Sequence, residues 1–381
     1  MRSRFAASFF ACLAVVVSST AAAEPTSLDP ALPYSAERTN PVTYDVDYSV
    51  VVTAPYKTKL LRVWMPVPPS NAGQEVFGVE WSTFPTDVAP QIAAESVFGN
   101  RFAYFEFASP PGAQVIRQRL KVKVWELRWN VKPESVATVE RWPSSFDPFR
   151  RSESQAVVVN DAHRELLSRI VPKRSNALNE FAAVMGYARD TFRYDHGYAS
   201  LAGDSSHAIR TGAGHCSDYH GFCAAVGRAL GYPTRITYGI NTFPKASPSH
   251  CKLETFLPPH GWVSFDVSET QKLTAAVQAD AALSDDEKKQ LFDAAVDRLQ
   301  SGFRDNTWYL QTVGSDYDLA PTASQRVPVV RTIYAEADGV ALPDPDPSDP
   351  NEKTFAWMTT TKFTPDREVK YPFANLKSLG K

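Results

Sequence analysis

The chain has 381 residues, of which 43% are hydrophobic and 22% are charged. This is the composition of a globular protein with room for about two domains. The formal net charge of −2 gives no reason to expect nucleic acid or an anionic membrane surface as a partner. Twenty-nine prolines favour strand edges and turns and argue against a helical bundle.

The first residues have the pattern of an export signal. Arg2 and Arg4 precede an apolar run over residues 5–17, and small residues before Glu24 fit a cleavage site. The run is too short to cross a bilayer. We therefore expect a signal peptide over residues 1–23 and no transmembrane segment after its removal. The mature chain would be periplasmic or secreted, with a net charge of −4 because two arginines are lost.

The part of the chain that follows, residues 24–135, reads as β-rich. Its strand-like segments carry β-branched and aromatic residues that often alternate with polar ones. These segments cover residues 42–52, 60–68, 101–107 and 115–129. No cluster of catalytic residue types lies among them. The pattern predicts an N-terminal β-sandwich-like domain within an α+β protein.

Helical patterns begin after a linker rich in proline and serine, within residues 155–330. Asn160 or Asp161 can cap one helix, and Ser175 is expected to cap the next, because such side chains accept hydrogen bonds from the free N–H groups of a first turn. A third helix begins at Cys216, directly after a glycine-marked loop. These helices belong to the core of a second predicted domain.

The rest of the core reads as strands with an added helix. One strand is expected within residues 231–241, and a hairpin turning at Pro258–Gly261 follows it. A serine and a glutamate at capping-box spacing predict a helix in an insertion near residues 275–303. A further strand is expected over residues 327–337, and residues 331–381 are expected to form C-terminal strands and a tail.

Cys216 stands at the start of its predicted helix. Gly212 and Gly214 permit a tight turn ahead of it, and Cys216, His220 and Cys223 recur at helical spacing. Free N–H groups and the positive end of the helix dipole favour the thiolate there. Three cysteines remain after signal removal, and an odd number leaves at least one thiol free. Cys216 is therefore the candidate nucleophile.

His250 and Asp266 lie on the two strands of the predicted hairpin. A turn centred near residues 258–259 pairs positions whose numbers have an even sum. The two side chains then share one face, either directly opposite or one diagonal step apart. A carboxylate there can hold one imidazole nitrogen and leave the other to take the thiol proton. The spacing thus predicts a Cys-His-Asp triad, provided that the turn contains no bulge.

Two segments, GAGHCSDYHGFCAAVGRALGYPTRITYGI and HCKLETFLPPHGWVSFDVSE, resemble the core of the transglutaminase-like superfamily, which has papain-like cysteine-enzyme ancestry. The resemblance covers roughly residues 155–330. It implies that Cys216 is the nucleophile, His250 the base and Asp266 the orienting carboxylate. Lys252 departs from the family, which often has tryptophan at this position, and the helical insertion is a second departure. Both departures bear on substrate preference more than on chemistry.

Other residues near the nucleophile have open roles. The possible site-lining residues are Asp218, Tyr219, His220 and Lys252. His215 neighbours the thiol in sequence, which does not make the two side chains face each other. Cys223 is expected in the core, and Cys251 is expected to point away from His250 into apolar surroundings. A disulfide between Cys223 and Cys251 would satisfy the cysteine count, but spacing does not establish it.

Two other classes of function remain open. Cys216 and His220, four positions apart on one helix face, could bind zinc with His250 as a third ligand. The hairpin aspartate and the lack of a second Cys/His pair make this less favourable. A catalytically silent module that binds peptide or cell-envelope polymer is the other alternative. No metal and no organic cofactor is expected.

These observations predict an exported cysteine-dependent amide hydrolase, similar to a peptidase or amidase, that works through a thioester. Its expected partners are protein or peptide amides, including cell-envelope peptides. The alternative within the same chemistry is a protein-glutamine acyltransferase that cross-links proteins. Hydrolysis is favoured because Lys252, if it shares the face of His250, would bring charge and hydration near the thioester.

Overall fold

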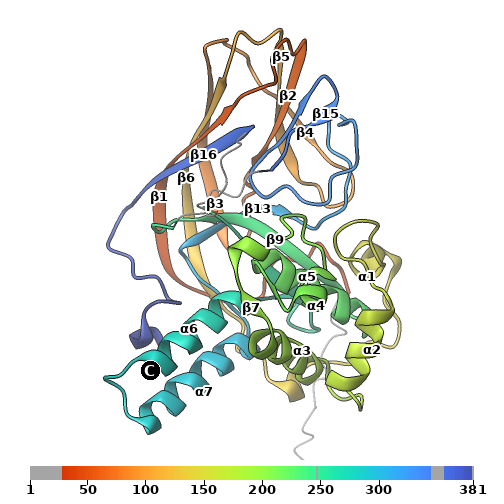
Figure 1. Cartoon of the computed structure of the whole chain (residues 1–381). Helices are drawn as coiled ribbons and strands as arrows, with labels where there is room; N and C mark the ends of the chain where they lie inside the picture. The colour runs from red at the N-terminus through yellow and green to blue at the C-terminus, as the bar shows by residue number, and fades with distance from the viewer. Residues whose placement is uncertain (1–27, 246–247, 345–355, 380–381) are drawn as a thin grey trace, which may run out of the picture.

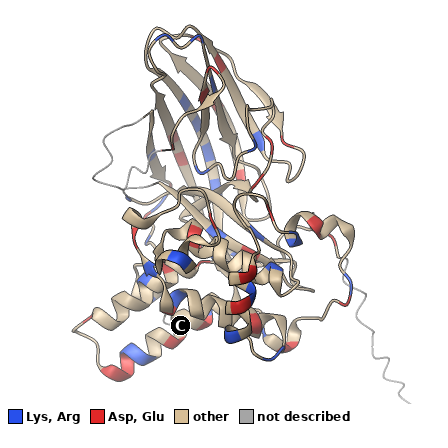
Figure 2. Cartoon of the chain, turned by 45° about the vertical axis from the view of Figure 1, so that its right-hand side comes forward, with Lys and Arg blue, Asp and Glu red and all other residues tan. Residues whose placement is uncertain are grey.

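The computed structural model describes residues 28–245, 248–344 and 356–379, so the predicted signal peptide lies outside the described residues. A β-sandwich occupies one end of the molecule and a helix-rich core the other (Figure 1). The architecture is α+β, as the sequence predicts. Lysines and arginines are interspersed with acidic residues over both parts (Figure 2), in keeping with the small net charge.

Two five-stranded sheets form the sandwich. The first has the order β12-β6-β1-β16, with β3 also paired to β6, and the second has the order β15-β14-β2-β5-β4. The strands of the first sheet are β1 (Glu37–Val52), β3 (Gln74–Phe84), β6 (Gln114–Arg128), β12 (Phe303–Arg304) and β16 (Trp357–Pro365). Those of the second are β2 (Leu60–Val67), β4 (Gln91–Ala94), β5 (Arg101–Ala108), β14 (Tyr334–Ala337) and β15 (Val340–Ala341).

Strand β1 explains why these sheets face each other. Tyr44, Val46 and Tyr48 are buried, whereas the intervening Asp45 is exposed and Asp47 is half-buried. A period of two places one set of side chains in the core and the other toward solvent. The inward-facing residues of β1, β2, β5 and β6 form one apolar cluster, so alternation in the sequence becomes the sandwich core.

The C-terminal segment completes the sandwich. Strand β14 pairs with β2, and β16 pairs with β1 along its full length. The strand expected over residues 327–337 is shorter in the structure. It begins only at Tyr334, and residues 327–333 form no regular strand. Strands β3 and β4 were not expected. Most residues of β3 are exposed or half-buried, which obscures the apolar alternation in its sequence.

The helices of the core begin close to their predicted caps. Asn160 accepts a hydrogen bond from the backbone of His163 at the start of α2. The cap of α3 is Asn176, which accepts from the backbone of Leu178 at 2.9 Å, so the expectation of Ser175 was wrong by one residue. The expected serine–glutamate capping box begins α7. The helices are α1 (Asp147–Arg150), α2 (Asp161–Ile170), α3 (Ala177–Thr191), α4 (His207–Thr211), α5 (Cys216–Ala229), α6 (Val267–Ala279) and α7 (Asp285–Ser301).

A four-stranded antiparallel sheet, with the order β11-β10-β9-β13, supports the core. Its strands are β9 (Thr234–Asn241), β10 (Ser249–Phe256), β11 (Trp262–Phe265) and β13 (Trp308–Val313). Two short strands, β7 (Arg193–Tyr194) and β8 (Ala213–Gly214), pair in parallel just before α5. Helix α5 packs on the sheet through an apolar cluster that includes Phe222, Cys223 and Leu253. This contact holds the first turn of α5 beside the β10–β11 hairpin.

Candidate active site

The start of α5 fixes the position of Cys216. Gly212 ends α4 with a φ of +67°, a left-handed conformation that favours glycine. A Cβ on Gly214 would lie 2.8 Å from the Cβ of Asp218, so this position has no room for a side chain. Asp218 accepts the backbone N–H of His215 at 2.8 Å and closes the first turn. The thiol of Cys216 therefore lies at a helix N-terminus, only 3% exposed.

The β10–β11 hairpin brings His250 to Asp266. The register pairs Glu254 with Ser264, so the paired numbers have an even sum and Lys252 lies across from Asp266. His250 is one diagonal step away. Its Nε2 donates to Oδ2 of Asp266 at 2.7 Å. Among the described residues, none hydrogen-bonds the other ring nitrogen, Nδ1, which is left to exchange a proton with a thiol.

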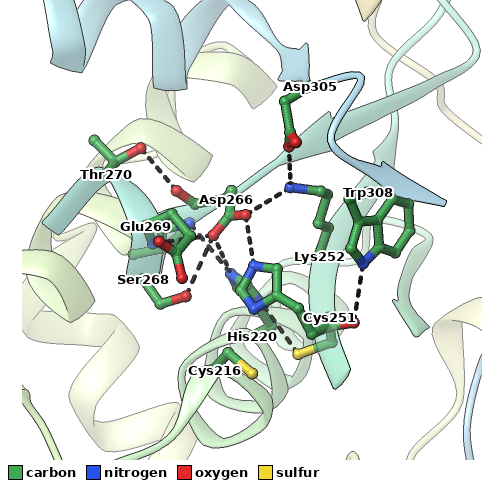
Figure 3. A network of polar contacts seen from close by, with 12 residues as sticks. Cys216, His220, Cys251, Lys252, Asp266, Ser268, Glu269, Thr270, Asp305 and Trp308 are labelled. Atoms are coloured by element: carbon green, nitrogen blue, oxygen red, sulfur yellow. Dashed lines mark hydrogen bonds and ion pairs between the residues drawn. The ribbon is translucent and has the colours of Figure 1, made fainter. Parts of the chain in front are cut away.

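Asp266 binds with both carboxylate oxygens (Figure 3). Oδ1 accepts the backbone N–H of Glu269 at 3.1 Å and so caps α6. Oδ2 accepts from His250 and from Nζ of Lys252, each at 2.7 Å. Capping α6 and orienting an imidazole are therefore compatible roles for this one side chain. The hydrogen bond from Glu269 holds the carboxylate in one orientation, and the carboxylate in turn orients the imidazole of His250.

Electrostatics favour an ion pair between Cys216 and His250. Burial opposes the thiolate, but hydrogen bonding from Cys251 and the charges of His215 and His250 hold the pKa of Cys216 well below its ordinary value. Burial likewise opposes protonation of His250, yet the charges of Asp266 and Cys216 raise its pKa to about 9. Both shifts favour the charged forms, the Cys216 thiolate and the His250 imidazolium.

His220 contacts neither Cys216 nor His250 through a hydrogen bond. Its Nε2 accepts the backbone N–H of Val267 at 3.2 Å, so its proton lies on Nδ1, 3.4 Å from Sγ of Cys251. Burial lowers the pKa of His220 to about 4, despite the nearby charges of Asp266 and Cys216. This neutral histidine, on α5, therefore connects its own helix to α6 and to β10.

Cys251 lies in the apolar core cluster, as expected, but its surroundings also include polar groups. Its Sγ is 3.4 Å from Nδ1 of His220. Burial and the neighbouring Cys216 thiolate raise the pKa of Cys251 well above its ordinary value, so it stays a thiol and can donate to the thiolate. Cys216, Cys223 and Cys251 are all free, so the structure contains no Cys223–Cys251 disulfide.

His215 is a site residue that the sequence did not indicate. Its Nδ1 lies 3.3 Å from Sγ of Cys216, although adjacency in a chain does not usually bring two side chains together. The reason is that His215 caps the helix in an extended conformation, which turns its side chain back over the first turn. Its ring packs against Tyr194 and His196, at centroid distances of 5.6 and 4.7 Å.

Lys252 is buried, with only 1% of its side chain exposed. Its Nζ donates to Asp266 at 2.7 Å and to Oδ2 of Asp305 at 2.8 Å. Burial opposes its charge, but the two carboxylates raise the pKa of Lys252 further above its ordinary value. The expectation that Lys252 brings hydration to the thioester was wrong, because the side chain lies within the protein interior behind Asp266. Asp305, just after β12, had no signal in the sequence.

Asp218 and Tyr219, predicted as possible site-lining residues, make other contacts. Asp218 closes the α5 turn and accepts from Ser200. The Tyr219 hydroxyl donates to the carbonyl of Phe192 at 2.7 Å and lies 3.0 Å from the side chain of Gln271. Both residues hold α5 against its neighbours, and neither hydrogen-bonds the thiol.

The zinc alternative finds no matching geometry. Within residues 28–245, 248–344 and 356–379, no three His, Cys, Asp or Glu side chains are arranged to hold a metal ion. The nitrogens of His220 are directed at Val267 and Cys251 rather than toward a shared centre with Cys216.

In the described part of the chain, no helix combines the length and the apolar character needed to cross a membrane.

Comparisons with known proteins identify the family of the core and similar folds. Residues 164–267 match the transglutaminase-like superfamily, a segment that contains Cys216, His250 and Asp266. No curated protein shows significant similarity to the sequence. The fold is similar to the crystal structure of a candidate cysteine protease from Cytophaga hutchinsonii, with a TM-score of 0.60 and 13% identity over 88% of this chain and 95% of that chain.

Two other solved structures show partial similarity. The periplasmic domain of TgpA from Pseudomonas aeruginosa, bound to ethylmercury, gives a TM-score of 0.30 with 16% identity, covering 61% of this chain and 90% of that chain. A candidate protease from Parabacteroides distasonis gives a TM-score of 0.24 with 11% identity, covering 61% of this chain and 43% of that chain.

Proposed function

For a chain with a transglutaminase-like superfamily core at residues 164–267, we propose a cysteine-dependent amide hydrolase that acts on peptides or proteins. Cys216 is the nucleophile, His250 the general base and acid, and Asp266 the residue that orients the imidazole. One observation carries this proposal. His250 donates a hydrogen bond from Nε2 to Asp266 at 2.7 Å, and the charges of Asp266 and then of the Cys216 thiolate raise the pKa of this ring to about 9 against the effect of burial.

The chemistry follows from these positions. The Cys216 thiolate attacks the amide carbonyl, and a C–S bond forms in a tetrahedral intermediate whose oxygen carries the charge. The backbone N–H of Cys216, at the helix start, is the donor that we assign to this oxygen. His250 gives its proton to the departing amine as the C–N bond breaks, which leaves a thioester. His250 then removes a proton from water, which attacks the thioester and releases the acid and the thiolate.

Water and amines compete for the thioester. Lys252 lies in the protein interior and brings no water to the site. It therefore gives no argument for hydrolysis. We keep hydrolysis as the proposal because an enzyme outside the cytoplasm meets water in large excess over any amine, and an amine transferase needs a site that excludes water. Cross-linking of protein glutamines is the competing outcome, with the same three residues.

We also propose that the protein is exported to the periplasm or secreted. Support comes from residues 1–23, whose two arginines, apolar run and small residues have the signal pattern. The three cysteines of the mature chain would then be buried free thiols in an oxidising compartment. Amino-terminal sequencing of the protein from the periplasm and the medium should give a chain starting at Glu24. A chain starting at Met1 would refute export with cleavage.

The nucleophile can be tested before any substrate is known. Limiting iodoacetamide on the folded protein, read by peptide mass spectrometry, should label Cys216 well before Cys223 or Cys251. The reason is that burial raises the pKa of Cys223, whereas the charged site lowers that of Cys216. Cys216→Ser should remove the fast-labelling site. First labelling at Cys251 would overturn the assignment.

The reaction type needs a second experiment. A pool of glutamine-containing peptides is incubated with the enzyme, with and without a biotinylated amine, and products are identified by mass. We expect cleaved or deamidated peptides that depend on Cys216. Biotin incorporation at low millimolar amine, lost in Cys216→Ala, would replace hydrolysis by acyl transfer and leave the triad in place. Turnover that persists in Cys216→Ala would contradict both reactions.

A further inference from the structure

Two lysines beside the site share one carboxylate. Nζ of Lys245 and Nζ of Lys272 each lie 2.9 Å from Oε1 of Glu269. Lys245, from the loop before β10, is 18% exposed, and Lys272 on α6 is 34% exposed. The Glu269 side chain is only 4% exposed. The two lysine side chains are therefore partly accessible to solvent, whereas the carboxylate between them is buried.

The lysine pair is connected to the thiol through two aromatic rings. Nζ of Lys272 is 3.9 Å from the ring centroid of Tyr194, whose ring packs against His215, and His215 lies 3.3 Å from Sγ of Cys216. From the other side, the Glu269 backbone N–H donates to Asp266, the partner of His250. Burial opposes the charge of Lys245, but the charges of Glu269 and of the Cys216 thiolate raise its pKa.

The glutamate is held in place by the C-terminal segment. The hydroxyl of Tyr371 donates to Oε2 of Glu269 at 2.7 Å, and the Tyr371 ring stacks on Phe243 with centroids 3.7 Å apart. Burial opposes ionisation of Glu269, but the charges of Lys245, His250 and Lys272 lower its pKa to about 2. With both oxygens engaged, Glu269 stays a fixed anion.

The charges and donors do not balance within this cluster. One carboxylate faces two ammonium groups, and each ammonium has three N–H donors. Glu269 takes one donor from each lysine, and the ring of Tyr194 interacts with the charge of Lys272 without accepting a conventional hydrogen bond. N–H donors of both ammonium groups remain for an anion that enters from solvent, in contrast to Lys252, which donates to two carboxylates.

We propose that Lys245 and Lys272 form a carboxylate-recognition site for the substrate, so that the preferred amides carry an anionic group close to the scissile bond. This inference deepens the proposed function and rests on it. Fixed cations beside a nucleophile bind such a group by charge-assisted hydrogen bonds and place the neighbouring carbonyl near the thiolate. Glu269 and Tyr371 keep the two ammonium groups in position.

The test compares two alkylating reagents on the same thiolate. Iodoacetate carries a carboxylate next to its reactive carbon, whereas iodoacetamide carries an amide and is otherwise similar. The ratio of their second-order rates at Cys216 cancels changes in thiol reactivity and reports recognition of the anion. We expect the double variant Lys245→Met/Lys272→Met to lower this ratio by about tenfold, as expected for the loss of two nearby charges. Lys272→Arg should keep most of the ratio.

Two further variants make the test specific. Glu269→Gln removes the resident anion and should raise the ratio. Lys289→Met removes an exposed lysine of α7 that pairs with Asp293, and it should leave the ratio unchanged. Thermal unfolding checks that each variant is folded. An unchanged ratio in the folded double variant, or an equal fall in Lys289→Met, would overturn the inference. A failure of the proposed function would instead appear as slow alkylation of Cys216 by both reagents.

Discussion

Several antiparallel strand pairs carry ion pairs, and two of these ion pairs differ strongly in their exposure to solvent. Between β1 and β6, Lys121 pairs with Asp45 on an open face, where the two side chains are 54% and 63% exposed. Across β10 and β11, Lys252 and Asp266 form an ion pair with 1% of each side chain exposed.

The local geometry of the two pairs is similar, but the cost is not. A surface ion pair keeps most of its hydration, whereas burying an ion pair costs roughly several kcal/mol of hydration free energy for each ion. A chain gains little stability from burying charge in this way. The buried pair is better explained by its neighbour: the oxygen that Lys252 binds is also the oxygen that orients His250. The buried pair of the hairpin therefore serves the site, whereas the Lys121–Asp45 pair of the sandwich lies in solvent.

The largest expected effect tests the hairpin. His250→Ala should lower kcat by roughly 10²- to 10⁴-fold, the usual contribution of a general base. His220→Ala should cost much less, because His220 bonds Val267 and Cys251 rather than the reacting groups. Steady-state kinetics on a peptide substrate measures both, with circular dichroism to confirm folding. A folded His220→Ala variant that loses more activity than His250→Ala would reverse the assignment.

Breaking the buried ion pair should have a large effect on stability. Lys252→Met leaves Asp305 and Asp266 without their shared cation, and we expect the free energy of unfolding to fall by about 3–5 kcal/mol. Urea denaturation measures this fall. The double variant Lys252→Met/Asp305→Asn removes one stranded charge and should recover part of the loss. If the double variant is no more stable than the single one, Asp305 is not the charge that Lys252 neutralises.

The pH dependence of stability should follow His250. Its pKa is raised from 6.5 to about 9, so it binds its proton more tightly in the folded state. The stability that it contributes is fully present below pH 6.5 and is lost as the pH rises through about 9. The difference in unfolding free energy between the wild type and His250→Gln should therefore shrink over this window. A difference that grows with pH would mean that His250 is buried neutral.

The smallest effect belongs to the surface pair. Lys121→Met should change the free energy of unfolding by less than about 1 kcal/mol and leave the reactivity of Cys216 as it is. The same denaturation and labelling measurements apply. A loss as large as that of Lys252→Met would remove the distinction between the two strand pairs.

The sequence indicates some features of this site better than others. The position of Cys216 at a helix start and the shared face of His250 and Asp266 follow from local rules, namely capping, strand alternation and an unbulged turn. Asp305 could not be found in this way. It meets Lys252 only because β12 pairs with β6 of the N-terminal sheet, a contact between segments far apart in the chain.

The same limit explains the other misses. Glu269 and Lys272 stand three positions apart on α6, a spacing that allows an ion pair, but Lys245 lies on a separate loop that no sequence pattern joins to them. The orientation of His215 depends on the backbone angles of a cap, which residue type alone does not determine. Where local periodicity sets the geometry, prediction from sequence is reliable. Where packing between distant segments sets it, the structure is needed.

The pairing of β16 with β1 has a consequence for the order of assembly. A ribosome makes β1 (Glu37–Val52) early and β16 (Trp357–Pro365) only after the whole catalytic core. Until then, one edge of β1 has no partner and displays a row of free N–H and C=O groups that other chains can join. Closing this sheet requires a contact of very long sequence separation, which makes folding slow. The nascent chain should therefore depend on a chaperone that covers extended segments, and removing residues 357–365 should leave β1 as an open edge.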